Sequence, residues 1–243
     1  MSPGVGMTTT TADAAHPAIR VLGAFAVWVN GRTVALPSNG QRVLGFLAVT
    51  GLEQRRDAVA THLWPAAAPD RAMSNLRTAL WRVRQADPAI VRACRDSVRL
   101  DDAVEVDYDR LSAQARRLIA EERPDDATVL EPDRLEADLL PGWDEEWLLL
   151  ERERYRQLRI HALETLSSLL TSRGLFARAI DMACAAIRVE PLHESAHAAL
   201  IAAHMAEGNR TEAIRHFNSY SRLLADETGL TPSTLLTALI SWD

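Results

Sequence analysis

The residues with the clearest chemical potential lie in the string PDRAMSNLRTALWRVRQ, between Pro69 and Gln85. Its polar side chains are arginines and short hydrogen-bonding residues, joined by one tryptophan: Arg71, Ser74, Asn75, Arg77, Thr78, Trp81 and Arg82. Arginine pairs with phosphates and guanine edges, and Asn, Ser and Thr reach bases or the sugar–phosphate backbone. This set of side chains predicts contact with a DNA duplex. An ordinary solvated amphipathic helix is the alternative that this stretch alone leaves open.

A single helix would position these side chains. Met73, Leu76, Leu80 and Val83 recur at i, i+3, i+7 and i+10, which places them on one face of a helix. Proline is favoured in the first helical turn, and Asp70 would complement the positive end of the helix dipole. We therefore predict a helix over 69–85, with its apolar face inward and its arginines on the other side.

Two further helices and a hairpin are predicted before this helix. The stretch Ile19–Val29 is rich in β-forming residues, and the Asn-Gly pair after it predicts a type I′ turn into a strand over 32–36. A capping-box pattern at Ser38–Gln41 predicts the start of a helix that ends at Gly51. A shorter helix is predicted over 57–64, where Arg55 offers a weaker cap than serine would.

A second hairpin is predicted after the arginine-rich helix, from strands over 90–93 and 98–100. It brings three arginines, Arg92, Arg95 and Arg99, to positions near phosphates or the minor groove. Two helices joined by a short turn, a basic third helix and a β-hairpin make a winged helix-turn-helix. A hairpin before the first helix is typical of the response-regulator, or OmpR-type, version.

The second half of the chain predicts helices throughout. Helices are expected over 107–121, 145–172, 175–189, 192–207, 209–226 and 233–241, with an acidic, proline-broken stretch at 122–138 and a turn at 139–143. GLFARAI at Gly174 and GNRTEAI at Gly208 match with an offset of 34 residues, the tetratricopeptide period. We expect Trp143 and Trp147 to pack the long helix onto this helical array; lining a small-molecule groove is the alternative.

Charge and composition bound the function. The formal net charge of −6 argues against a uniformly basic nucleic-acid binder, but residues 1–110 carry +2 and residues 111–243 carry −8. The first part is thus the better partner for a polyanion. Every basic residue is arginine, so a lysine nucleophile, a Schiff base or a P-loop lysine is excluded.

No enzyme, cofactor or metal centre is expected. The sequence has no GxSxG, GxGxxG or phosphate-loop motif, and its two cysteines, Cys94 and Cys184, fall in different predicted domains. His193 and His197 have a spacing that can ligate metal, but a structural role is the stronger interpretation because no third ligand is evident. No apolar run is long enough for a membrane span, and residues 1–17 lack the features of a signal peptide. We therefore expect a disordered leader and a cytoplasmic protein.

Two strings resemble a known family. LWPAAAPDRAMSNLRTALWRVR resembles the OmpR-type domain of the Streptomyces antibiotic regulatory proteins. LLPGWDEEWLLLERERYRQLRIHALETL and the stretch from PLHESAHAALIAAHMAEGN to LTPS resemble the bacterial transcriptional activation domain that follows it in that family. The resemblance covers about residues 19–241. It implies a transcriptional activator, often encoded within secondary-metabolite gene clusters, that binds direct repeats in promoters.

The resemblance also implies partners and further site residues. The partners would be double-stranded DNA, RNA polymerase holoenzyme and a second copy of the chain on DNA, with an unknown effector left open. The loop between the second and third helices would touch polymerase through Trp64, Pro65, Ala66 and Asp70. Position 81 is usually small or polar in such helices, so Trp81 departs from the pattern and base preference does not carry over.

The expected architecture is mainly α. A winged helix-turn-helix domain over 18–104 would follow the 1–17 leader, and an all-α tetratricopeptide-like domain would occupy 105–243. A function of a different class stays open: the helical array could be a ligand- or protein-binding module with vestigial DNA binding, and its negative charge would suit a basic partner.

Overall fold

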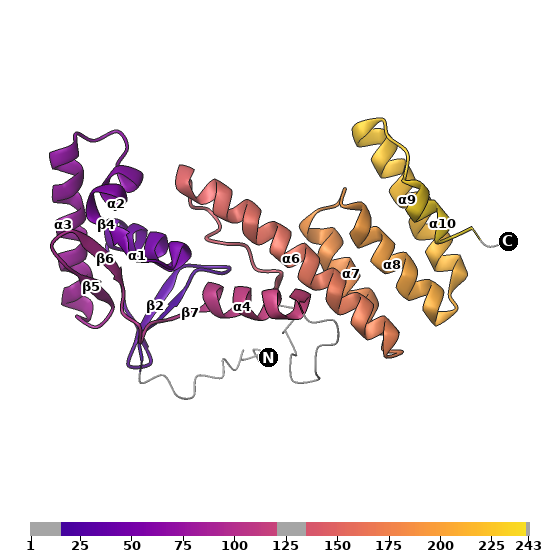
Figure 1. Cartoon of the computed structure of the whole chain (residues 1–243), viewed down its shortest axis with the longest axis horizontal. Helices are drawn as coiled ribbons and strands as arrows, with labels where there is room; N and C mark the ends of the chain where they lie inside the picture. The colour runs from indigo at the N-terminus through magenta and orange to yellow at the C-terminus, as the bar shows by residue number, and fades with distance from the viewer. Residues whose placement is uncertain (1–15, 121–134, 242–243) are drawn as a thin grey trace, which may run out of the picture. The chain divides into compact units, whose positions relative to one another are not determined.

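The computed structural model describes residues 16–120 and 135–241. Within these ranges the chain forms two compact units (Figure 1). The first comprises the residues up to Arg110 together with Asp138–Leu148, and the second comprises the remaining described residues. Most of the predicted leader and of the acidic 122–138 stretch lies outside the described residues.

A small sheet opens the first unit. Its strands β1 (Ala18–Arg20), β2 (Ala26–Val29), β3 (Arg32–Thr33) and β7 (Glu105–Val106) take the order β3-β2-β1-β7. The expected turn at Asn30-Gly31 is present, since both residues have positive φ and join β2 to β3. The expectation of one β-rich stretch over 19–29 was wrong in one respect. The chain reverses around Gly23, so β1 and β2 pair antiparallel.

Three helices form the centre of the first unit: α1 (Ser38–Thr50), α2 (Arg56–Leu63) and α3 (Pro69–Ala86). Their inward residues are fully buried, as the apolar spacing predicted, and include Leu44, Leu63, Leu76 and Val83. The predicted capping box was wrong. Pro37 is the N-cap residue of α1 and Ser38 is already helical, so Nε2 of the Gln41 side chain instead donates to the Leu36 carbonyl at 2.8 Å.

The predicted second hairpin is confirmed and gains a third strand. Strands β5 (Val91–Ala93) and β6 (Ser97–Leu100) pair antiparallel, and β4 (Gln54–Arg55) joins the far side of β6. Because β4 directly precedes α2, this sheet fixes the hairpin to the helix-turn-helix. The absence of a side-chain cap on α2 agrees with the weak cap expected at Arg55.

The segment Asp138–Leu148 also belongs to the first unit. The Gly23 amide donates to the Asp138 carbonyl at 2.8 Å, and the Leu140 amide donates to the Val21 carbonyl at 2.7 Å. The expectation that Trp143 and Trp147 pack the long helix onto the helical array was therefore wrong. The ring centroids of Trp143 and Phe25 lie 5.4 Å apart. Those of Trp147 and Phe46 lie 5.0 Å apart, and these two rings meet edge to face.

Helices make up the second unit. The chain continues through α4 (Asp107–Ala120), α6 (Glu146–Ser172), α7 (Phe176–Val189), α8 (Glu194–Glu207), α9 (Arg210–Thr228) and α10 (Thr234–Ala238). Gly174 and Gly208 both have the left-handed backbone that glycine adopts without strain, and each precedes the next helix. Ala179 and Ala213, one repeat apart, are both fully buried, as close packing of paired helices requires.

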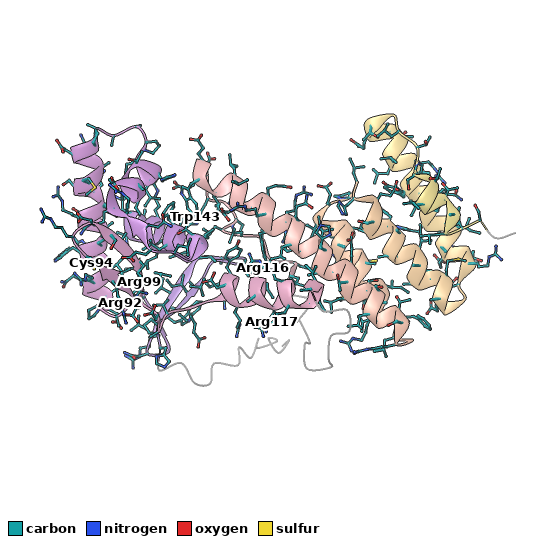
Figure 2. The ribbon with its side chains drawn as sticks, in the orientation of Figure 1. Arg92, Cys94, Arg99, Arg116, Arg117 and Trp143 are labelled. Carbon is teal, nitrogen blue, oxygen red and sulfur yellow. The ribbon has the colours of Figure 1, made fainter. Side chains whose placement is uncertain are left out.

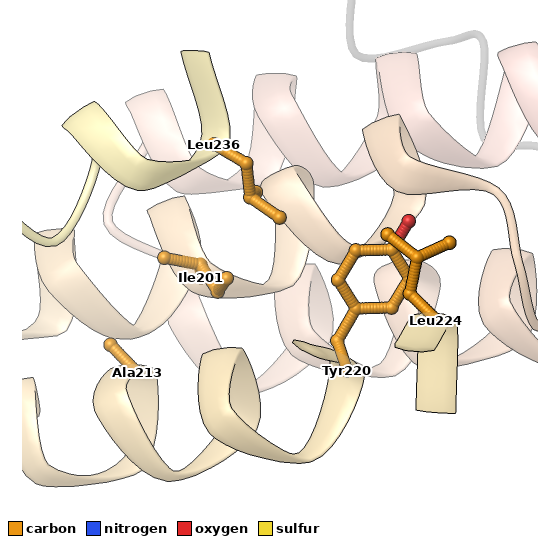
Figure 3. Packing of buried hydrophobic residues seen from close by; sticks show 5 residues of the cluster. All are labelled: Ile201, Ala213, Tyr220, Leu224 and Leu236. Atoms are coloured by element: carbon orange, nitrogen blue, oxygen red, sulfur yellow. The ribbon is translucent and has the colours of Figure 1, made fainter. Parts of the chain in front are cut away.

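Helices α8, α9 and α10 share a hydrophobic core. Ile201, Ala213, Tyr220, Leu224 and Leu236 form a buried cluster (Figure 3). The alanine lets α9 approach α8, and the larger side chains fill the remaining space. Together the two units confirm the predicted fold class, a winged helix-turn-helix followed by a helical domain.

Candidate nucleic-acid interface

Helix α3 has one buried and one exposed side. Ala72, Leu76, Ala79, Leu80 and Val83 are buried, which orients the helix on the core. The opposite arc is exposed and holds Arg71, Ser74, Arg77, Thr78, Trp81, Arg82, Arg84 and Gln85, while Asn75 lies half-buried at its border. All the predicted groove-facing residues except Asn75 are thus fully on the surface. Arg84 joins them and was not among the residues singled out from the sequence.

The arginines of this arc are free of carboxylates. None of Arg71, Arg77, Arg82 and Arg84 forms an ion pair within residues 16–120 and 135–241. Other exposed arginines are paired, for example Arg215 with Glu212 at 2.9 Å. Guanidinium groups without ion pairs among the described residues give this helix face a positive charge that suits a polyanionic partner.

Trp81 is the odd member of the arc. It is 52% exposed, so its ring is not buried against a neighbouring element of the described chain. The Arg82 guanidinium lies over the ring at 4.8 Å from its centroid, a cation–π arrangement. The ring therefore presents an apolar surface in the middle of a cationic one.

The three wing arginines are not equivalent. Arg92 and Arg99 face each other directly across the β5–β6 ladder, where two like charges repel. Two aspartates that follow the hairpin offset this repulsion. Arg92 Nε lies 2.6 Å from Asp101, Arg92 Nη1 lies 3.3 Å from Asp102, and Arg99 also pairs with Asp102. Figure 2 shows both arginines on the wing.

These pairs persist at neutral pH. A hydrogen bond from Arg92 lowers the pKa of Asp101, and one from Arg99 lowers the pKa of Asp102. Arg95, at the turn between the strands, is exposed and has no ion pair among the described residues. Of the three predicted wing contacts, Arg95 is the one whose charge is available without breaking an existing pair.

The wing is held to the start of α2 by two hydrogen bonds from Arg56, one from its backbone and one from its side chain. The Arg56 amide donates to the Asp96 carbonyl at 2.9 Å, and its guanidinium donates to the Cys94 carbonyl at 3.1 Å. The turn of the hairpin is thereby fixed to the start of α2. The α3 arc and the wing lie in the same compact unit.

The loop between α2 and α3 forms a shallow hollow. It is lined by Leu63, Trp64, Pro65, Ala66, Ala67 and Ala68, with Arg42 and Arg71 as its charged members. Trp64 is half-buried, whereas Pro65, Ala66 and Asp70 are exposed. The predicted polymerase-contact residues thus lie together at one end of α3. Arg42 was missed, because its place beside the loop depends on a contact between helices.

The histidines of the second unit form a structural network. His197 Nε2 lies 2.8 Å from the Pro191 carbonyl and must donate to it, which leaves Nδ1 to accept from His216 Nε2 at 2.8 Å. Burial lowers the pKa of His216 to about 4, helped by the nearby His197 and His204. Burial also lowers the pKa of His197.

The described residues do not form a metal site around these histidines. Across residues 16–120 and 135–241, no group of three or more His, Cys, Asp or Glu side chains could hold a metal ion. None of the helices in those ranges is long and apolar enough to cross a bilayer.

Comparisons with known proteins agree with this architecture. Residues 106–241 match the family model described as the bacterial transcriptional activator domain. The regulatory protein AfsR of Streptomyces coelicolor is 29% identical over 225 residues, which cover 87% of this chain and 22% of AfsR. The chain therefore spans about a fifth of the length of that relative.

A solved structure shares the fold. EmbR of Mycobacterium tuberculosis, in complex with a low-affinity phosphopeptide, superposes with a TM-score of 0.74 at 18% identity, covering 93% of this chain and 64% of EmbR. The family match spans more than half of the chain. The chain belongs to the bacterial transcriptional activator domain family of regulators and has the two-part organisation of the Streptomyces antibiotic regulatory proteins.

Proposed function

We propose that this chain is a sequence-specific DNA-binding transcriptional activator. The observation that carries the proposal is the α3 arc, where Arg71, Arg77, Arg82 and Arg84 are exposed without carboxylate partners among the described residues. A major groove admits a helix of this kind, and its phosphates supply the missing negative charge. Because α3 buries its apolar side, the exposed arc is the side that would face the groove.

We assign different residues of the α3 arc to phosphate contacts and to base contacts. Arginines near the ends of α3, together with Arg95 on the wing, would fix the register on the duplex through phosphates. Ser74, Arg77, Trp81 and Arg82, in the middle of the arc, would read base edges. We propose that residues 18–104 bind DNA and carry the polymerase-contact loop, and that the helical domain over 105–243 handles dimer contact or signal input.

The activating step is proposed for the α2–α3 loop. The exposed Pro65 and Ala66 and the half-buried Trp64 form an apolar surface at the end of α3 nearest the loop, where RNA polymerase holoenzyme could dock beside the DNA. Membership of an activator-domain family supports this direction of regulation. Binding as side-by-side protomers on direct repeats, control of secondary metabolism, response to an effector and location in the cytoplasm on the nucleoid are parts of the same proposal.

A binding and transcription assay tests the proposal. The purified chain is titrated onto duplex fragments from its own upstream region across a series of salt concentrations, and bound regions are footprinted. Transcription is then measured on the bound promoter with purified RNA polymerase. Protection of repeated sites, weakening with salt and a rise in transcript are expected. Absence of binding at low salt would favour the alternative of a protein- or ligand-binding module.

A further inference from the structure

One guanidinium in the first unit makes an unusual number of contacts. Arg42, on α1, donates from Nε and Nη2 to the two carboxylate oxygens of Glu145, at 2.5 and 2.9 Å. Its Nη2 also donates to the Leu63 carbonyl at 2.5 Å. Leu63 is the last residue of α2, so Arg42 satisfies a carbonyl that the helix itself leaves unpaired.

The same group borders the first residue of the α2–α3 loop. The Arg42 guanidinium carbon lies 5.6 Å from the centre of the Trp64 ring. The side chains of Arg42 and Glu145 are 27% and 14% exposed, so their pair is shielded from much of the solvent. A two-pronged, partly buried arginine–carboxylate pair holds its geometry better than an exposed one.

The α2–α3 loop makes few stabilising interactions within itself. Residues 65–68 are proline and three alanines, which have no polar side chains. Within the described residues, the loop's internal backbone bond is the Ala67 amide to the Trp64 carbonyl, at 3.0 Å. Its conformation is therefore set at its ends, by Arg42 at the α2 end and by Pro69 at the α3 end.

Glu145 comes from the part of the chain that matches the activator-domain family. It directly precedes α6, whereas Arg42 and the loop lie more than 75 residues earlier. The carboxylate fixes the rotamer of Arg42, and Arg42 in turn contacts the end of α2 and Trp64. The activator-domain segment thus reaches the loop through one intermediate side chain.

We infer that Arg42 and Glu145 are positioning residues for the α2–α3 loop. Their pair holds Trp64 and the hollow beside it in the shape that RNA polymerase meets, so Glu145 contributes to activation without touching DNA. The inference rests on the proposed role of the loop in contacting polymerase. It predicts that breaking the pair separates DNA binding from activation.

The test uses the full chain with R42Q, R42K and E145Q. R215Q is the matched control, because Arg215 pairs with Glu212 at 2.9 Å on α9. DNA affinity is measured by titration, and activation is measured in purified transcription on the same promoter. R42Q and E145Q should keep DNA affinity within about twofold and lose activation by about fivefold or more, the scale of one charge-assisted contact. R42K retains a charge but not the forked geometry, so it should fall between.

Hydrogen exchange provides a second readout that does not require polymerase. The amides of Trp64 and Ala67, which donate to the Ala60 and Trp64 carbonyls, should exchange faster in R42Q and E145Q than in the wild type or R215Q, while amides buried in α1 keep their protection. Unchanged activation and unchanged exchange in a variant that still binds DNA would overturn the inference. If the wild type binds DNA but does not activate transcription, the proposed function is contradicted. The exchange rates of the loop amides in R42Q then decide by themselves whether the Arg42–Glu145 pair positions the loop.

Discussion

Gly45 and Trp143 touch so closely that no side chain fits between them. A Cβ atom on Gly45 would lie 2.7 Å from Cζ3 and 2.8 Å from Cη2 of the Trp143 ring. The Trp143 ring also lies 5.4 Å from Phe25. The segment Asp138–Leu148 is therefore packed into the first unit through the Trp143 ring, which lies against α1. The first unit thus needs residues from the activator-domain match to complete its core.

This contact predicts that G45A destabilises the protein. The added methyl meets a rigid ring, so the free energy of unfolding should fall by about 1–3 kcal/mol, despite the better helix propensity of alanine. Gly40 on the same helix is the matched control, because its Cβ would lie 3.6 Å from the nearest atom. G40A should leave stability unchanged or raise it. Urea unfolding measures both, and a G45A variant as stable as G40A would contradict the packing.

Asp102 restrains the wing, because it pairs with both Arg92 and Arg99. D102N should free part of their charge for phosphates, so DNA affinity should rise and the salt dependence should steepen by about one unit of slope for each additional phosphate that is bound. D96N removes a charge from the same hairpin without releasing an ion-paired arginine, and serves as the control. Titrations at several salt concentrations would contradict this role if D102N bound DNA no more tightly than D96N.

Trp81 is expected to read a thymine methyl group. Its exposed ring offers a large apolar surface on the α3 arc, and the C5-methyl is the apolar feature of the major groove. Replacing the contacted thymine by deoxyuridine removes one methyl, which should cost about 0.8 kcal/mol, or about fourfold in affinity. W81A should bind both duplexes equally. If no single thymine replacement weakens the wild type, the ring packs on sugar instead.

The His197–His216 pair predicts acid sensitivity in the second unit. The pKa of His216 is about 4 in the folded chain, below the ordinary 6.5, so the unfolded chain binds more protons between these values. The contribution of a neutral His216 to the free energy of unfolding should be fully present above about pH 6.5 and should be lost as the pH falls toward 4. H216Q keeps a donor for His197 Nδ1 but does not titrate, so its decline should be smaller. Unfolding midpoints over this pH range measure the difference, and identical profiles would remove His216 as the cause.

Local patterns predicted the elements that depend on neighbours in the sequence. The apolar spacing from Met73 to Val83 located α3, and the Asn30-Gly31 pair located the β2–β3 turn. The paired glycines and alanines of the repeat located the helices of the second unit. The capping box failed because Pro37 already occupied the cap position, and the β-rich stretch failed because Gly23 allowed a reversal inside it.

Contacts between distant segments could not be predicted in this way. Nothing near Trp143 in the sequence points to Gly45, and nothing near Glu145 points to Arg42. The wing offered a usable signal: two arginines placed opposite each other in a hairpin, followed by Asp101-Asp102, indicate internal neutralisation. That the exposed arc and Arg95 contact DNA stays a prediction.

The salt dependence of DNA binding by R77A and R82A shows whether the α3 arginines, which have no ion pair among the described residues, bind DNA. Arg178, exposed on α7 in the second unit and without an ion pair among the described residues, provides the control R178A. Each α3 variant should lose about 1–3 kcal/mol of affinity if its arginine reads a base, or lower the salt slope by about one if it contacts a phosphate. R178A should match the wild type. Wild-type affinity and slope in both R77A and R82A would contradict the account.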